Sequence, residues 1–181
     1  MANKLIIVPY DPKWPHLFSK LGSMLRDGLG AIALRIDHIG STSIAGLAAK
    51  PIIDIQISVA EFEPLDLYRL PLEELGYVFR AKNPELTKRY FREQPGARRT
   101  HIHVRRSGSW AEQFALLFRD YMRSHDEDVQ AYAKLKYDLA KEYREDRQRY
   151  TDAKAPLIWE IMRKADRWSQ ETGWKPGLTG R

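Results

Sequence analysis

The sequence of 181 residues contains no cysteine, which excludes disulfide bonds, thiolate metal sites and a cysteine nucleophile. No apolar run approaches the roughly 20 residues that a membrane-spanning helix needs. The apolar stretch near the N-terminus, residues 5–8, is too short for a signal peptide. Internal repeats and low-complexity tracts are also absent. We therefore expect a globular, cytoplasmic protein with no membrane partner.

A local excess of positive charge is the first feature that is present. The chain has 30 Lys and Arg against 24 Asp and Glu, a net charge of +6, and residues 80–106 alone hold nine cations and two carboxylates. Charge concentrated in this way favours an anionic ligand, although a solvated surface without a partner would explain it equally well. Because no recognisable nucleic-acid module frames the segment, a nucleotide or phosphorylated small molecule is the expected partner rather than nucleic acid.

Hydrophobic periodicity predicts a single domain with a mixed α/β core over about residues 7–106 and a helical extension over about residues 109–170. Strands are predicted at residues 34–39, 51–59, 77–80, 88–92 and 100–105, the last two as a hairpin. Helices are predicted at residues 17–29, 64–75, 109–123, 128–147 and 151–168. Pro71 should lie at a helix break or in a new first turn, and Ser109 with Glu112 forms a capping-box signature.

A turn of small residues, Gly40-Ser41-Thr42-Ser43, follows the first predicted strand. Small residues let a phosphate approach the backbone, and their hydroxyl and amide groups can donate to it. Lys50 then adds a cation, and Asp54 and Gln56 stand on the polar face of the next strand, where a carboxylate could hold a divalent ion. A serine-rich helix N-cap before an ordinary strand is the alternative, but it leaves the aspartate within the apolar residues 52–55 unexplained.

Two histidines alternate with apolar residues in the last predicted strand, so His101 and His103 share a face. Such a pair can bind a metal, shuttle protons or contact phosphate. A zinc site would require a third ligand that the spacing does not supply, so a place in a ligand pocket is favoured. Arg89 and Arg99, in or beside the same hairpin, could clamp a phosphate or carboxylate. The mixed-sign run at residues 142–149 is typical of a solvated helix face.

Several motifs together resemble the GrpB family. They are Pro9-Tyr10-Asp11-Pro12-x-Trp14, the long segment from His38 through Gly40-Ser41-Thr42-Ser43 to Lys50-Pro51-Ile52-Ile53-Asp54, His101-Ile102-His103-Val104, Phe118-Arg119-Asp120-Tyr121-Met122-Arg123, Tyr132-Ala133-x-Leu135-Lys136, and Lys154. The match runs from about Ile7 to Ala165, and its central motif is highly specific. The chain is therefore identified as a member of this family.

The resemblance implies a nucleotidyltransferase-like α/β fold with an N-terminal helix and a C-terminal helical extension. In that superfamily a Gly-Ser turn precedes an Asp-x-Asp or Asp-x-Glu strand, and a third acid completes a site for two divalent ions around a nucleoside triphosphate. Here Gly40-Ser41 and Asp54 match, so Mg²⁺ at Asp54 is the implied cofactor. Gln56 replaces the second acid, and His101 and His103 stand on the strand of the third, a change that weakens a site built from oxygen ligands.

Two functions follow, and the sequence leaves open whether the protein is an enzyme. The first is transfer of a nucleotidyl group to a small acceptor, with Asp54 on Mg²⁺ and His103 as proton acceptor or auxiliary ligand. The second is a non-catalytic phosphometabolite-binding or regulatory module linked to coenzyme A metabolism, because GrpB-like domains occur fused to dephospho-CoA kinase in some bacteria. Since no Gly-x-x-x-x-Gly-Lys-[Ser/Thr] loop is present, that link would act in trans.

Both functions use the same expected site. The nucleotide- or phosphate-binding residues would be Gly40, Ser41, Thr42, Ser43, Lys50, Arg89 and Arg99, and the pocket would also include His38, Gln56 and His101. Because strand alternation places Asp54 beside Gln56 and His101 beside His103, we expect these four side chains and Ser41 to line one cleft.

Overall fold

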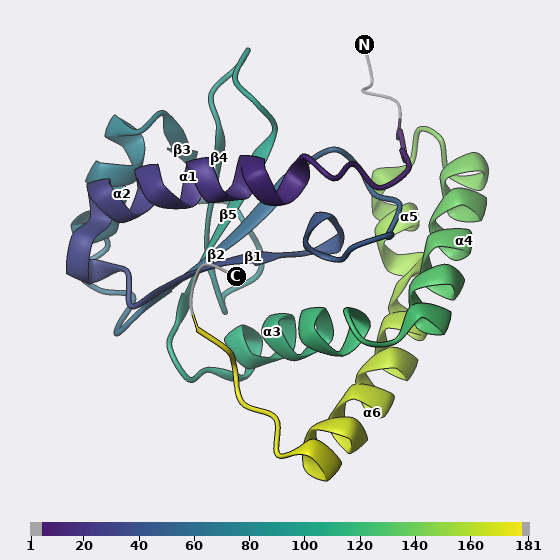
Figure 1. The fold of residues 1–181 in the computed structure, drawn as a ribbon. Coiled ribbons are helices and arrows are strands. Elements are labelled where there is room, and N and C mark those ends of the chain that lie inside the picture. The colour runs from purple at the N-terminus through teal and green to yellow at the C-terminus, as the bar shows by residue number, and fades with distance from the viewer. Residues whose placement is uncertain (1–4, 179–181) are drawn as a thin grey trace.

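One mixed sheet of five strands organises the computed structural model, which describes residues 5–178 (Figure 1). The strands are β1 (Arg35–Ile39), β2 (Ile53–Val59), β3 (Tyr77–Phe79), β4 (Arg89–Glu93) and β5 (Thr100–Arg106). The helices are α1 (Trp14–Leu29), α2 (Asp66–Glu74), α3 (Trp110–Met122), α4 (Asp126–Glu142), α5 (Arg147–Ala153) and α6 (Ala155–Thr172), with short 3-10 turns η1 (Gly30–Ile32) and η2 (Ser41–Ser43). The predicted mixed α/β fold is confirmed. No helix in the described range is long and apolar enough to cross a bilayer.

The strand order, β1-β2-β5-β4-β3, places β2 and β5 side by side at the centre of the sheet. These two strands run parallel, whereas the other neighbours are antiparallel, including the predicted β4–β5 hairpin. In the β2–β5 register Asp54 lies opposite His101, and Gln56 lies opposite His103. The topology therefore brings together the two motifs that the sequence separates by about fifty residues.

The apolar face of the sheet packs against α1 and α2, as Figure 1 shows. The isoleucines at alternate positions of β2 are fully buried there with residues of β4 and β5 such as Phe91 and Ile102. The alternation in β2 thus correctly predicts which side chains enter the core. Pro71 differs from expectation, because it lies inside α2 rather than at a break or in a first turn.

The opposite face is covered by α3 at its β1–β2 side, so the polar positions of β2 are not all exposed. Ser109 caps α3 by accepting a hydrogen bond from the Glu112 amide, as predicted. The Glu112 carboxylate is buried and accepts from the hydroxyl of Ser58 and the amide of Gly108. Gln56 is also fully buried and donates to the Glu112 carbonyl at 3.3 Å. The helix therefore occupies the region where the sequence suggests an open polar face.

Helices α4, α5 and α6 lie beside one end of the sheet, with α6 also packing along α3 (Figure 1). Apolar side chains of α3, α4 and α6 form a second core with Ile44, Leu47 and Ala48 of the segment between β1 and β2. Tyr150 of α5 is buried separately, against Leu5 and Leu139. The helix predicted at 128–147 ends at residue 142, and the one predicted at 151–168 is divided at Lys154. Pro156 explains the division, because proline fits the first turn of a helix but not its interior.

Candidate functional site

Asp54 is the centre of the site and accepts hydrogen bonds from two histidines on the neighbouring parallel strand. Its Oδ1 atom lies 3.2 Å from Nδ1 of His101 and 3.1 Å from Nε2 of His103. Burial alone would raise the pKa of Asp54, but the hydrogen bonds from both rings hold that pKa well below its usual range. Burial also lowers the pKa of His103, so this ring is neutral at pH 7. Asp54 therefore carries a negative charge within a hydrogen-bonded group of three side chains.

Gly40 allows the turn after β1 to approach this carboxylate closely. Its φ of +68° is a conformation that other residues adopt only with strain. A Cβ atom at this position would lie 2.8 Å from Oδ2 of Asp54. The glycine thus places η2 directly against Asp54, and Ser41 then reaches the cavity beside it.

Three lysines surround that cavity, which has a volume of about 200 Å³ and which we call the lysine cavity. Lys136 of α4 donates to the Ser41 hydroxyl at 3.0 Å, and Lys50 and Lys154 lie 4.4 and 4.6 Å from the ring centre of Tyr150. Within residues 5–178 none of the three forms an ion pair with a carboxylate. The complete lining is Ser41, Thr42, Ala49, Lys50, Ile52, Asp54, His101, Lys136, Tyr150 and Lys154.

The environment of these lysines disfavours their charged forms. Burial, together with the charge of Lys154, lowers the pKa of Lys136 to about 7. Burial and the charge of Lys154 likewise lower the pKa of Lys50 to about 8, although Asp54 opposes the shift. Burial lowers the pKa of Lys154 as well. Like charges are therefore gathered in a poorly solvated space, which is the condition that a bound anion would relieve.

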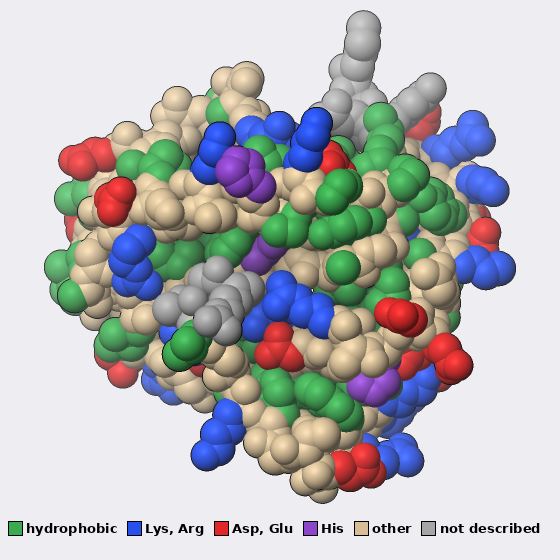
Figure 2. Space-filling view, viewed as in Figure 1, with side chains coloured by type: hydrophobic (Ala, Val, Ile, Leu, Met, Phe, Trp, Pro, Cys, Tyr) green, Lys and Arg blue, Asp and Glu red, His purple; other side chains and the backbone are tan. Residues whose placement is uncertain are grey.

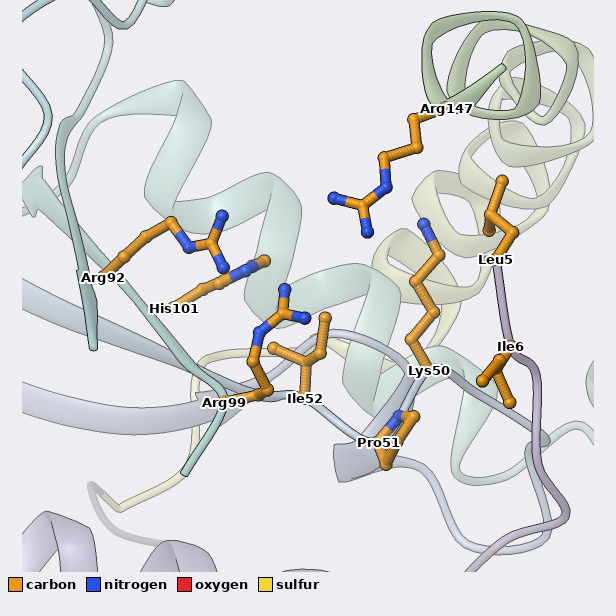
Figure 3. Close-up of a pocket in the computed structure, with 9 residues that line it drawn as sticks. All are labelled: Leu5, Ile6, Lys50, Pro51, Ile52, Arg92, Arg99, His101 and Arg147. Atoms are coloured by element: carbon orange, nitrogen blue, oxygen red, sulfur yellow. The ribbon is translucent and has the colours of Figure 1, made fainter. Parts of the chain in front are cut away.

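A second cavity of about 250 Å³ adjoins the first, since Lys50, Ile52 and His101 line both. We call it the arginine cavity, because it is also lined by Arg92, Arg99 and Arg147, together with Leu5, Ile6 and Pro51. Figure 3 shows Arg92 projecting from β4, Arg99 from the chain just before β5 and Arg147 from α5, with their guanidinium groups directed into the same space. The two cavities thus form a continuous basic site at the end of the sheet.

The structure brings some of the predicted site residues together and leaves others apart. Gly40, Ser41, Thr42, Lys50, Asp54, Arg99, His101 and His103 lie in or beside the two cavities. Thr42 directs its hydroxyl to the Ile52 carbonyl, however, and the buried Ser43 donates to the Gly40 carbonyl. Their hydroxyl groups are therefore used within the turn.

Three predicted residues differ clearly from expectation. Gln56 is buried under α3 instead of lining the cleft. His38 stacks on Phe18 within the protein, and burial lowers its pKa to about 3. Arg89 pairs in register with Val104 and packs over the Phe62 ring, so it lies on the face of the sheet opposite the histidines. Each of these differences is explained either by the face of the sheet to which the side chain points or by another element that covers it.

Several residues of the site were not predicted as such. Lys136 and Lys154 appear only in the family motifs, and Tyr150 and Arg92 were not singled out as ligand-binding residues. A signal for Lys136 exists, because it interrupts the apolar stripe of α4. Arg147 belongs to the run expected to be a solvated face, yet it lines the arginine cavity.

The rest of the surface shows no comparable concentration of one charge on the face drawn in Figure 2. Lys and Arg side chains there alternate with Asp and Glu and with hydrophobic side chains.

Comparison with solved structures defines the class of fold. The chain superposes on a cytoplasmic RNA terminal U-transferase with a TM-score of 0.51 and 15% identity, covering 74% of this chain and 43% of that one. At this identity the likeness concerns the fold alone, which is that of the nucleotidyltransferases. A much closer match is the conserved protein GrpB from Enterococcus faecalis, with a TM-score of 0.81 and 32% identity over 90% of this chain and 99% of that one.

Sequence comparisons give the family. A family model described as GrpB protein matches residues 4–164, so the chain belongs to the GrpB family. It is 36% identical to a UPF0157 protein of Halalkalibacterium halodurans, over 90% of this chain and 83% of that protein. It is also 33% identical to the dephospho-CoA kinase of Mycolicibacterium paratuberculosis, over 94% of this chain but only 48% of that protein.

Proposed function

We propose that this protein binds the phosphate groups of a nucleotide or another phosphorylated small molecule in the lysine cavity. The observation that carries the proposal is the convergence of Lys50, Lys136 and Lys154, none of which forms an ion pair with a carboxylate of the described residues 5–178. Holding these charges together in a buried space is unfavourable unless an anion neutralises them. Phosphate oxygens would accept hydrogen bonds from the ammonium groups and from the Ser41 hydroxyl.

The arginine cavity would receive the remainder of the ligand. Arg92, Arg99 and Arg147 can bind further phosphates, while Ile6 and Pro51 provide apolar contacts for a base or another uncharged group. A ligand with several phosphates would therefore extend from the Ser41 turn toward Arg92 and Arg99. The Mg²⁺ that the family resemblance implies is not included, because the chain offers it a single carboxylate, Asp54, beside two imidazoles.

The first test is a calorimetric titration with phosphate, pyrophosphate, ATP and dephospho-CoA. Arg99→Ala and Arg147→Ala should each weaken the tightest of these ligands about tenfold or more, because each removes charged hydrogen-bond donors from the cavity. Arg149→Ala is the matched control, since this exposed arginine pairs only with Asp146. Equal effects of all three variants would show that the basic residues act as a diffuse surface, and the absence of any binding by the unmodified protein would refute the proposal.

Binding should also weaken as the pH rises, because Lys136 and Lys50 lose their charges near pH 7 and 8. The charged side chains that line the cavity with Lys136 are Lys50, Lys154 and Asp54, beside the titratable His101 and Tyr150. Ser41 and Tyr132 are the neutral neighbours of Lys136. We expect affinity for sulfate, whose own charge is constant here, to fall about tenfold or more between about pH 6.5 and about pH 9. Calorimetry in buffers of different ionisation enthalpy should show proton uptake on binding. A pH-independent affinity would contradict the assignment of these lysines as anion ligands.

Nucleotidyl transfer to a small acceptor is a second candidate. The observation that favours it is the close approach of the Gly40-Ser41 turn to Asp54 within a nucleotidyltransferase-like fold. A regulatory module acting on coenzyme A metabolism is the alternative suggested by the dephospho-CoA kinase relative. Pyrophosphate release from nucleoside triphosphates, lost in Asp54→Asn, would support transfer. Binding of dephospho-CoA without turnover would support the module.

A further inference from the structure

The group formed by Asp54, His101 and His103 has a donor set that Mg²⁺ does not favour. It is the one cluster of three potential metal ligands that the described part of the chain contains, and its ligand atoms lie within 4.8 Å of one another. Mg²⁺ requires nearly octahedral oxygen coordination and retains its water ligands strongly. One carboxylate and two imidazoles do not meet that requirement. The metal implied by the fold family therefore does not fit the residues that are present.

The same donor set is well suited to a divalent transition metal. Two histidines and one carboxylate, with a further position open, form a common protein site for Zn²⁺ and related ions. Zinc bonds of about 2.0–2.1 Å in a tetrahedral site separate neighbouring ligand atoms by roughly 3.3 Å. Here Oδ1 of Asp54 lies 3.2 Å from His101 Nδ1 and 3.1 Å from His103 Nε2. Both separations between the carboxylate and an imidazole nitrogen are thus already close to the required value, and all three ligand atoms lie within 4.8 Å of one another.

We propose that Asp54, His101 and His103 form a binding site for a zinc-like divalent metal ion. The third ligand that the histidine pair lacks in the sequence is supplied by Asp54 from the parallel strand β2. Because Asp54 and His101 also line the lysine cavity, an ion held by them would lie beside the space assigned to phosphate. This last relation rests on the proposed function, whereas the metal site itself does not.

Gln56 provides an independent observation in favour of the site. When His103 binds a metal through Nε2, its proton must reside on Nδ1, which metal-bound histidines usually donate to a fixed acceptor. Both His103 Nδ1 and Gln56 Oε1 are buried without a hydrogen-bond partner in the described structure. The two residues pair in register on adjacent strands and face the same side of the sheet. We assign Gln56 as the positioning residue that accepts this proton's hydrogen bond.

The experiment uses Zn²⁺ and Co²⁺ alone, in phosphate-free buffer, with the full-length chain. We expect one ion per chain, Zn²⁺ binding at least about 100-fold tighter than Mg²⁺, and a Co²⁺ absorption spectrum typical of tetrahedral coordination. His101→Ala and His103→Ala should each remove this spectrum, whereas His16→Ala, which changes an exposed histidine on α1, should not. Circular dichroism of each variant establishes that the fold is retained. Zn²⁺ affinity unchanged in both histidine variants, or equal affinity for Mg²⁺, would overturn the site.

Two further variants separate the parts of the argument. Gln56→Glu keeps an acceptor for His103 and should retain the Co²⁺ spectrum, whereas Gln56→Leu should weaken metal binding about tenfold or more. Equal affinities of these two variants would overturn the role of Gln56. Lys136→Met should retain metal binding even when it loses phosphate binding. Failure of the metal site and failure of the phosphate proposal are therefore observed in different titrations.

Discussion

Lys136→Met is expected to abolish phosphate binding and, at the same time, to raise the free energy of unfolding. Lys136 is 2% exposed and lies on α4 with the buried apolar residues Val129 and Tyr132. Its ammonium donates to Ser41, and burial together with the charge of Lys154 lowers its pKa to about 7. Methionine has a similar length and extends the apolar stripe without a charge. Removal of the buried charge should therefore add about 2 kcal/mol of stability at neutral pH.

The stabilisation should depend on pH in a direction that the lowered pKa determines. Lys136 titrates near its ordinary value of 10.5 in the unfolded chain but at about 7 in the folded one. The unfolded state therefore binds more protons between these values, and the stability of the unmodified protein increases with pH there. The cost of the buried charge is complete below about pH 7 and disappears toward pH 10.5. In urea unfolding, the gain in free energy of unfolding of Lys136→Met over the unmodified protein should therefore be larger at about pH 6 than at about pH 9.

Ligand binding provides the second measurement on the same variant. Phosphate that binds only the folded state must raise the melting temperature of the unmodified protein, and this rise should vanish in Lys136→Met. Lys134→Met is the matched control, because Lys134 lies on the same helix but is exposed and pairs with Asp138. A methionine variant that is less stable at both pH values and still binds phosphate would show that Lys136 anchors η2 to α4 and has no ligand role.

Local periodicity was sufficient to predict much of the fold. Alternation in residues 53–59 correctly places the isoleucines in the core and Asp54 on the other face, because a strand has a period of two residues. The same rule places His101 and His103 on one face of β5. The juxtaposition of Asp54 with both histidines also requires the parallel pairing of β2 with β5. No short-range pattern specifies that pairing, and it was not predicted from the sequence: one shared cleft was expected from the alternation within each strand alone.

The remaining differences arise from contacts between distant segments. Gln56 obeys the alternation, but α3 covers its position, and the sequence of β2 contains no information about that coverage. Arg89 lies two positions before the core residue Phe91 on β4, so both side chains point to the same face of the sheet. That face is the one opposite the site. Lys136 reaches Ser41 across 95 positions of sequence. A buried lysine in an apolar stripe is a recognisable anomaly, but only the tertiary fold identifies what it faces.

Asp37→Ala is expected to destabilise the fold by about 3 kcal/mol, because it removes the carboxylate that pairs with a buried arginine. Asp37 of β1 is fully buried, and Arg119 of α3 is 2% exposed. The two groups lie 3.4 Å apart, and Arg119 also donates to the His38 carbonyl and to Asp120. This contact joins the sheet to the helix that covers Gln56, so its loss should also loosen the polar face behind the site.

A double substitution distinguishes the cost of an unpaired charge from a net contribution of the ion pair. Replacing both partners, as Asp37→Leu with Arg119→Met, removes both buried charges of the pair and leaves the partly exposed Arg35 and Asp120 without these partners. It should restore stability to within about 1 kcal/mol of the unmodified protein. Asp138→Ala, which disrupts the exposed pair with Lys134, should change the free energy of unfolding by less than about 0.5 kcal/mol. Denaturant unfolding measures all three. If the double variant is as unstable as Asp37→Ala, the pair itself holds α3 on the sheet, and the buried charge that loses the Asp37 carboxylate is not the cause.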